Sequence, residues 1–118
     1  MDESRPIFIQ IAERIEDDIM SEALAEGAQI PSINEYAAFY RINPATANKG
    51  VGLLVDSGVL FKKRGIGMFV AEGSRVRILE SRRSTFETEF VRPLVAEARN
   101  LGISTTQLSE LIMKEENQ

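Results

Sequence analysis

The sequence predicts an α+β fold in which helices and one short β-hairpin are followed by an all-helical extension. Three observations support this order. Apolar residues recur at helical spacing up to residue 58, a β-rich run with two glycines occupies residues 59–70, and helical spacing returns after Gly73. A chain of 118 residues suits one small domain with an appendage. We expect these parts to be residues 1–73 and 74–118.

The first predicted helix extends from Pro6 to about Ala25 and is followed by Gly27. Isoleucines and alanines at helical spacing form its inner face, and acidic residues between positions 13 and 18 fill the outer face. Paired carboxylates can act as acid and base in hydrolysis. No nucleophile or base lies beside them in the sequence, so we interpret them as a solvated face.

Local capping signals place the next two helices. Ser32 and Glu35 have the spacing of a capping box, which predicts a short helix from residue 33 onward. Asn43 can cap a third helix, and Pro44 suits its first turn. The apolar stripe of this helix should face inward, and it consists of Ala47, Val51, Leu54 and Val55.

The outer face of the third helix carries side chains that suit the DNA major groove. Asn48 can pair with adenine through its amide, and Ala45 can contact a thymine methyl group. Thr46 suits a phosphate, whereas Lys49 can reach either a guanine or a phosphate. Asn43 lies at the same helix end. The alternative is an ordinary solvated face, which the adjoining motifs disfavour.

Residues 59–70 predict a β-hairpin whose tip is Arg64-Gly65-Ile66-Gly67. Lys62, Lys63 and Arg64 place three positive charges beside Gly65 and Gly67. Such a tip can lie along the DNA backbone or insert Arg64 into a narrow minor groove. Lysines also protect exposed strand edges, and both roles can hold together. Three helices followed by such a hairpin constitute a winged helix-turn-helix.

The charge distribution supports a nucleic-acid partner although the net charge is −4. Residues 1–40 carry −7 and residues 78–118 carry −2, whereas residues 41–77, with seven basic and two acidic side chains, carry +5. This basic segment coincides with the third helix and the hairpin. A local field steers a protein to DNA more than its total charge does.

Composition excludes several other classes of protein. The chain has no cysteine and no histidine, so disulfides, thiolate metal sites and the commonest general base are absent. We therefore expect that the protein is not an enzyme and binds no metal or cofactor. Glutamates at positions 87, 89, 97 and 110 could bind a hard cation, but their spacing does not require one. No membrane span or signal peptide is evident, which predicts a cytoplasmic protein without a membrane partner.

The extension after Gly73 continues as helix, with Pro93 inside it, and Ser104 and Gln107 offer another capping box. Pro93 should kink or divide this helix. The following apolar residues are candidates for a dimer interface: Leu79, Phe86, Phe90, Leu94, Leu101, Leu108 and Leu111. They could pack on the N-terminal domain, but so small a piece cannot bury them alone. A homodimer that reads a pseudo-palindromic operator is the preferred interpretation.

Residues 6–70 resemble the GntR superfamily of bacterial transcription regulators. The resemblance rests on Pro6, on Gln10-Ile11-Ala12, on Ile30-Pro31-Ser32, on Asn43-Pro44 with Thr46, and on Gly58 before the wing residues 64–70. Residues 90–104 resemble the two-helix tail of the YtrA subfamily. This second resemblance implies a dimerisation tail and a repressor that commonly controls ABC-transporter operons.

The chain departs from the family pattern at several positions. Ser32 and Asn34 begin the helix that contacts the DNA backbone in the family, but members often have arginine where this chain has Asn34. A glycine is commoner at Glu22 or Ala23. Two glycines inside the third helix, at positions 50 and 52, each cost about 1 kcal/mol of helix propensity and indicate close packing or close approach to DNA.

The expected function is therefore sequence-specific repression by a homodimer bound to double-stranded DNA. Two alternatives remain: a winged helix that binds a protein through its acidic first helix, and a DNA-architectural protein without sequence preference. The sequence identifies neither an effector nor the sign of regulation. Any effector should act at the dimer interface and bind the two DNA-binding states differently.

Overall fold

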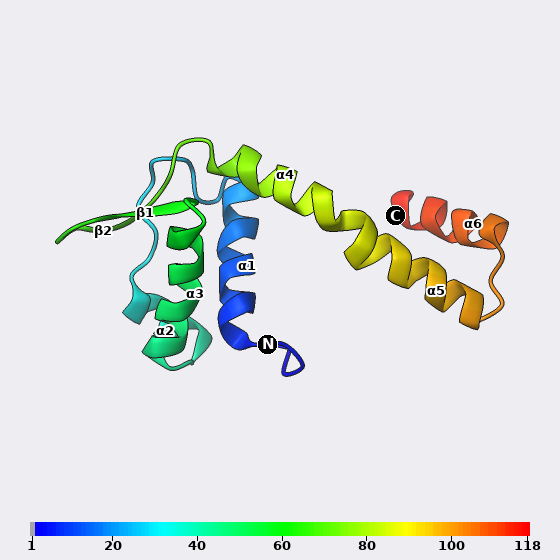
Figure 1. The fold of residues 1–118 in the computed structure, drawn as a ribbon, viewed down its shortest axis with the longest axis horizontal. Helices are drawn as coiled ribbons and strands as arrows, with labels where there is room; N and C mark the ends of the chain where they lie inside the picture. The colour runs from blue at the N-terminus through cyan, green and yellow to red at the C-terminus, as the bar shows by residue number, and fades with distance from the viewer. Residues whose placement is uncertain (1) are drawn as a thin grey trace. The chain divides into compact units, whose positions relative to one another are not determined.

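The computed structural model describes residues 2–118, and Figure 1 shows its elements in chain order. The bounds of the first five elements are α1 (Ile7–Met20), α2 (Ile33–Tyr40), α3 (Pro44–Asp56), β1 (Leu60–Lys63) and β2 (Gly67–Val70). The remaining bounds are α4 (Ser74–Phe86), a π-helical segment (Glu87–Val91), α5 (Arg92–Asn100) and α6 (Thr105–Glu116). This order confirms the predicted α+β fold. Contacts divide the chain into two compact units, one that ends at Glu80 and one that comprises residues 81–118.

The core of the first unit lies between α1 and α3, which pack side by side (Figure 1). It is formed chiefly by Ile11, Ile15 and Ile19 of α1, Ala47, Val51 and Leu54 of α3, and Leu60, Val70 and Ile78. Each large apolar side chain contributes about 1.5–3 kcal/mol by leaving water. Gly50 permits the close approach, because a Cβ there would lie 2.7 Å from the Phe8 carbonyl oxygen. A Cβ at Gly52 would meet no atom within 4 Å.

The first helix is shorter than the sequence predicts: α1 ends at Met20, not near Ala25. Glu22 has a φ of 66°, the left-handed conformation that favours glycine. The Leu24 amide then donates to the Asp18 carbonyl oxygen at 2.9 Å, which turns the chain back over the helix end. Apolar spacing did not reveal this end, because alanines continue beyond the turn.

The predicted helix starts are confirmed. The Ser32 hydroxyl accepts from the Glu35 amide, and the Glu35 carboxylate accepts from the Ser32 amide, so α2 begins with a complete capping box. The Asn43 side chain accepts from the Ala45 amide at 2.8 Å and caps α3. Ser104 and Gln107 form the same reciprocal pair at the start of α6.

The hairpin is antiparallel and pairs Leu60 with Val70 and Lys63 with Gly67. Figure 1 shows it extending away from α3. Residues 27–30 add backbone hydrogen bonds along the other edge of β2, for example from the Ile30 amide to the Met68 carbonyl oxygen at 2.9 Å. The sequence had indicated only a loop there.

The start of α4 is held on the first unit by polar contacts. The Ser74 hydroxyl is buried and donates to the Val59 carbonyl oxygen at 2.7 Å. The Glu26 carboxylate accepts from the amides of Gly73 and Arg75 and so caps α4 from another part of the chain. Within α4, Ile78 is buried and Val76 is exposed.

In the second unit, the backbone stays helical on both sides of Pro93, with a π-helical segment before it and α5 after it. Pro93 has no amide hydrogen to donate, and the π-helical segment directly before α5 absorbs this defect. The Arg92 amide donates to the Glu87 carbonyl oxygen, five residues earlier. After residues 101–104, the chain reverses direction and continues as α6 (Figure 1).

Candidate nucleic-acid interface

The first turn of α3 presents the polar residues that the sequence singled out. Ala45 and Asn48 are exposed, and Thr46 is half-buried. Asn43 is exposed, and its side-chain oxygen accepts the capping hydrogen bond, so its amide nitrogen is the group that can reach a base or phosphate. The cap therefore orients the same residue that is predicted to contact DNA.

Lys49 is directed to the beginning of α1. Its ammonium nitrogen lies 4.1 Å from the centroid of the Phe8 ring, which is a cation–π contact. This contact limits the freedom of the side chain and places a positive charge where α1 and α3 meet. A fixed ammonium group there suits a DNA phosphate better than a base edge.

The start of α2 presents Ser32 and Asn34, and both are exposed. Hydrogen bonds from the Ser32 backbone, and then from its side chain, lower the pKa of Glu35 below its ordinary value. The Glu35 carboxylate is therefore ionised and directed to the cap at neutral pH. Asn34 has no charge to offer a phosphate, so this contact should depend less on salt than an arginine contact.

The hairpin separates its two lysines onto opposite faces. Lys63 lies over the Phe69 ring, with 4.4 Å from its ammonium nitrogen to the ring centroid. Lys62, its neighbour, pairs with Met68 and lines a groove together with Asn48 of α3. Arg64 and Gly65 are exposed at the tip.

The groove brings three elements together. It is open, encloses about 740 Å³, and lies where the wing faces the starts of α2 and α3. Four of the predicted DNA-binding residues line it: Ser32, Asn48, Lys62 and Gly67. Glu35 also lines it, with its carboxylate bonded to the Ser32 amide. The groove thus combines a hydroxyl, an amide and an ammonium group from three elements with apolar side chains such as Ile30 and Met68.

Gln29 is a residue of this site that sequence reasoning missed. Its amide nitrogen donates to the Ile66 carbonyl oxygen at 3.1 Å and so supports the wing tip. Gly67 opposite has a φ of 148°, and a Cβ there would lie 2.6 Å from the Gln29 amide nitrogen. The sequence offered no signal for this contact, because the two residues are far apart along the chain.

No group of three or more acidic side chains within residues 2–118 is placed to hold a metal ion. On the acidic helix, Glu13 accepts two hydrogen bonds of 2.8 Å from the Arg5 guanidinium group, a structural ion pair at the surface. None of the described helices has both the length and the apolar character needed to cross a bilayer.

Comparison with known proteins decides the family. Residues 9–70 match the gntR family of bacterial regulatory proteins. The chain belongs to the GntR family. The resemblance stated from the sequence is thus confirmed, and the family consists of transcription regulators, not enzymes.

Individual GntR relatives match over different lengths. YtrA, a transcriptional repressor of Bacillus subtilis, is 27% identical over 109 residues, which cover 92% of this chain and 83% of YtrA. A GntR-family protein from Bacteroides thetaiotaomicron is 34% identical, with a TM-score of 0.72 over 94% of this chain and 96% of that one. AraR(DBD), solved in complex with operator ORX1, is 30% identical with a TM-score of 0.55 over 60% of this chain and 87% of that one.

Proposed function

We propose that this GntR regulator is a repressor that binds a pseudo-palindromic operator as a homodimer. The observation that carries the proposal is the groove in which the starts of α2 and α3 face the wing. The hydroxyl of Ser32 and the ammonium group of Lys62 in its lining, and the net charge of +5 over residues 41–77, suit the phosphate backbone. The operator complex of AraR(DBD) supports double-stranded DNA as the partner.

We assign residues to roles by their geometry. We propose base contacts in the major groove for the exposed residues Ala45 and Asn48, and a contact from the wing tip for Arg64. Backbone contacts come from the remaining predicted residues: Ser32, Asn34, Asn43, Thr46, Lys49, Lys62, Gly65 and Gly67. Lys63 packs on the outer hairpin face and contributes chiefly to the local positive field.

We further propose that residues 81–118 form the dimer interface. This unit has 38 residues and no cysteine, which is below the size at which a chain usually folds stably alone. Large apolar side chains remain exposed in it, including Phe90 at 63% and Leu101 at 66%. A second copy would cover them and place two recognition helices on one operator. Leu79, which the sequence grouped with them, lies in the first unit.

The YtrA likeness suggests ABC-transporter operons as targets.

The test is a fluorescence-anisotropy titration with the DNA upstream of the chain's own gene and with scrambled DNA, at two salt concentrations. We expect tighter binding to the upstream fragment at both. Arg64→Ala should weaken binding by about 1 kcal/mol, or roughly fivefold in Kd. It should also reduce the slope of log Kd against log salt concentration by about one, because one phosphate contact fewer releases counterions. Arg14→Ala removes the same charge from the exposed face of α1, outside the groove, and should leave Kd unchanged.

Three results would contradict the proposal. Equal binding to both DNAs that collapses at the higher salt concentration would indicate an architectural protein, because only the phosphate backbone is then read. An unchanged Kd for Arg64→Ala would remove the wing from the interface. Complete absence of DNA binding would favour the protein-interaction alternative, for which the acidic face of α1 is the candidate surface.

A further inference from the structure

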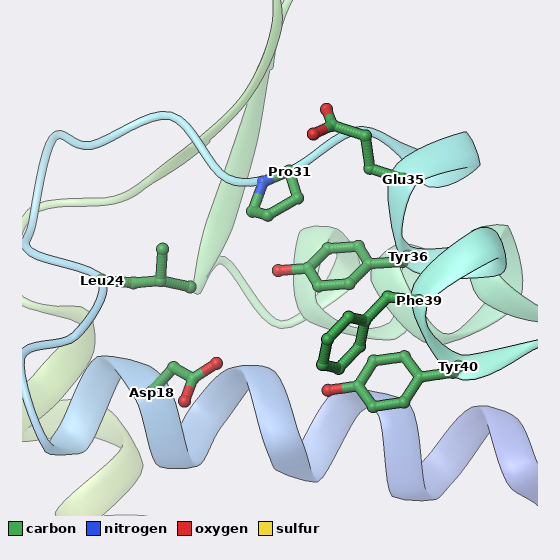
Figure 2. A pocket seen from close by; sticks show the side chains of 7 residues that line it. All are labelled: Asp18, Leu24, Pro31, Glu35, Tyr36, Phe39 and Tyr40. Carbon is green, nitrogen blue, oxygen red and sulfur yellow. The ribbon is translucent and has the colours of Figure 1, made fainter.

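A second concave site adjoins the groove and shares Leu24, Pro31 and Glu35 with it, and the DNA-binding proposal does not use this second site. It encloses about 320 Å³ and is bounded by α1, by the loop that follows it and by α2. Figure 2 shows its lining, which consists of Asp18, Leu24, Pro31, Glu35, Tyr36, Phe39 and Tyr40. This volume is at the lower end of those that hold small molecules.

Three aromatic rings form one wall. The Tyr36 and Tyr40 rings are nearly parallel, with centroids 6.3 Å apart, and the Phe39 ring stands edge-on to Tyr40 at 4.9 Å. Phe39 is 79% exposed, so a large apolar ring is left at the rim of the site. Aromatic faces attract cations, and the Arg14 guanidinium carbon already lies 5.7 Å from the Tyr40 ring centroid.

The charged residues that line the site have one sign. Asp18 and Glu35 are the charged residues of the lining, and both are acidic. Burial, and then the Asp18 carboxylate, raise the pKa of Tyr36 above its ordinary value, which keeps its hydroxyl neutral. Arg14 beside the Tyr40 ring offsets one of these two negative charges. The site therefore combines an apolar aromatic wall with one excess negative charge, which favours cations over anions.

One buried polar group remains unsatisfied. The Tyr36 side chain is 7% exposed, and within residues 2–118 its hydroxyl has no hydrogen-bond partner. Figure 2 shows this hydroxyl directed from α2 across the site toward Leu24. A buried hydroxyl without a partner costs about 1–3 kcal/mol, and a ligand N–H group that donates to it recovers this energy.

We propose that this site binds a small organic ammonium ion. The cation lies against the aromatic rings and between the two carboxylates, an N–H group donates to the Tyr36 hydroxyl, and a short alkyl body packs on Leu24 and Pro31. Glu35 also caps α2, so the bound cation competes with the Ser32 amide for its carboxylate. This link to DNA rests on the proposed function, whereas ligand binding itself does not.

Tyrosine fluorescence reports on this site alone, because both tyrosines of the chain line it and the chain has no tryptophan. We expect n-butylammonium chloride to change the emission saturably, with a Kd of roughly 1 mM for a ligand of this size. Sodium butyrate, n-butanol and sodium chloride at matched concentrations should have no saturable effect. Saturable binding of n-butanol with the same Kd would show a merely apolar pocket and overturn the proposal.

Matched variants test the individual groups. Asp18→Asn should weaken butylammonium binding at least fivefold, whereas Asp56→Asn, which removes a carboxylate outside the site, should not. Tyr36→Phe should weaken butylammonium but not tetramethylammonium, which has no N–H group to donate; Tyr40 then remains as the reporter. Equal Kd values for wild type and Asp18→Asn would overturn the role of charge. Emission that changes with protein concentration alone would indicate a second copy in the site and overturn ligand binding.

The coupling to DNA has its own readout. At saturating butylammonium, Kd for the upstream DNA should change for the wild type and stay constant for Phe39→Ala, which lacks the exposed aromatic ring. If ligand binds but Kd for DNA is unchanged, the coupling is refuted and the binding site stands. If DNA fails to bind under any condition, the proposed function fails, independently of the fluorescence result.

Discussion

At the scale of single residues, backbone conformation explains one departure from the family sequence. Glu22 and Arg41 are the described non-glycine residues with positive φ, and Glu22 occupies the turn where glycine is commoner in the family. A side chain in this conformation costs about 1–2 kcal/mol. The turn after α1 therefore favours glycine, and this chain forms the same turn with Glu22 at an energetic cost.

Glu22→Gly should raise the free energy of unfolding by about 0.5–1 kcal/mol, because the strain at φ 66° is relieved while the unfolded chain gains some freedom. Chemical denaturation measures the change. Glu22→Ala removes the same carboxylate but keeps the strain, so it should not reproduce the gain. Stabilisation of equal size by both variants would attribute the effect to charge.

At the scale of elements, local sequence signals predicted where helices start. Tertiary contacts determine other features, such as the strand-like pairing of residues 27–30 with β2. The caps at Ser32, Asn43 and Ser104 depend on residues within one turn, so the sequence reveals them. Pairing of residues 27–30 with β2 depends on segments about 40 residues apart along the chain. The π-helical segment before Pro93 is likewise a backbone feature that apolar periodicity does not reveal.

The candidate site shows the same limit. Sequence reasoning named the exposed polar residues of α3 and the wing, because their types and spacing match DNA chemistry. It did not reveal that Lys62 and Lys63 face opposite ways, although strand alternation implies this once the register is known. The support of the wing by Gln29 requires the fold itself.

The packing of α1 on α3 gives two glycines of one helix opposite roles. Gly50→Ala should destabilise the protein by about 1–3 kcal/mol, because the new Cβ would meet the Phe8 carbonyl oxygen at 2.7 Å. Gly52→Ala should stabilise it by about 1 kcal/mol, since its Cβ meets nothing within 4 Å. Thermal unfolding of both variants measures the contrast. Stabilisation by both would show that helix propensity outweighs this contact.

At the scale of the whole molecule, exposed apolar side chains of the second unit require an explanation. Ala98 is the buried apolar residue of the described part of this unit, whereas Phe86 and Phe90, with ring centroids 5.7 Å apart, are exposed. An exposed aromatic pair on a unit of this size is typical of an interface between subunits. Dimerisation would also double the number of recognition helices and so couple assembly to DNA affinity.

Phe90→Asp places a charge in this aromatic pair and should convert the dimer to a monomer, because an unpaired carboxylate in an apolar interface is costly to desolvate. Light scattering coupled to size exclusion should then give the mass of one chain instead of two. DNA affinity should fall as well, since two half-sites are no longer bound together. Phe39→Asp, which alters an exposed phenylalanine of the first unit, should remain dimeric. A dimer that survives Phe90→Asp but dissociates with Phe39→Asp would relocate the subunit interface to α2 and overturn the role proposed for the second unit.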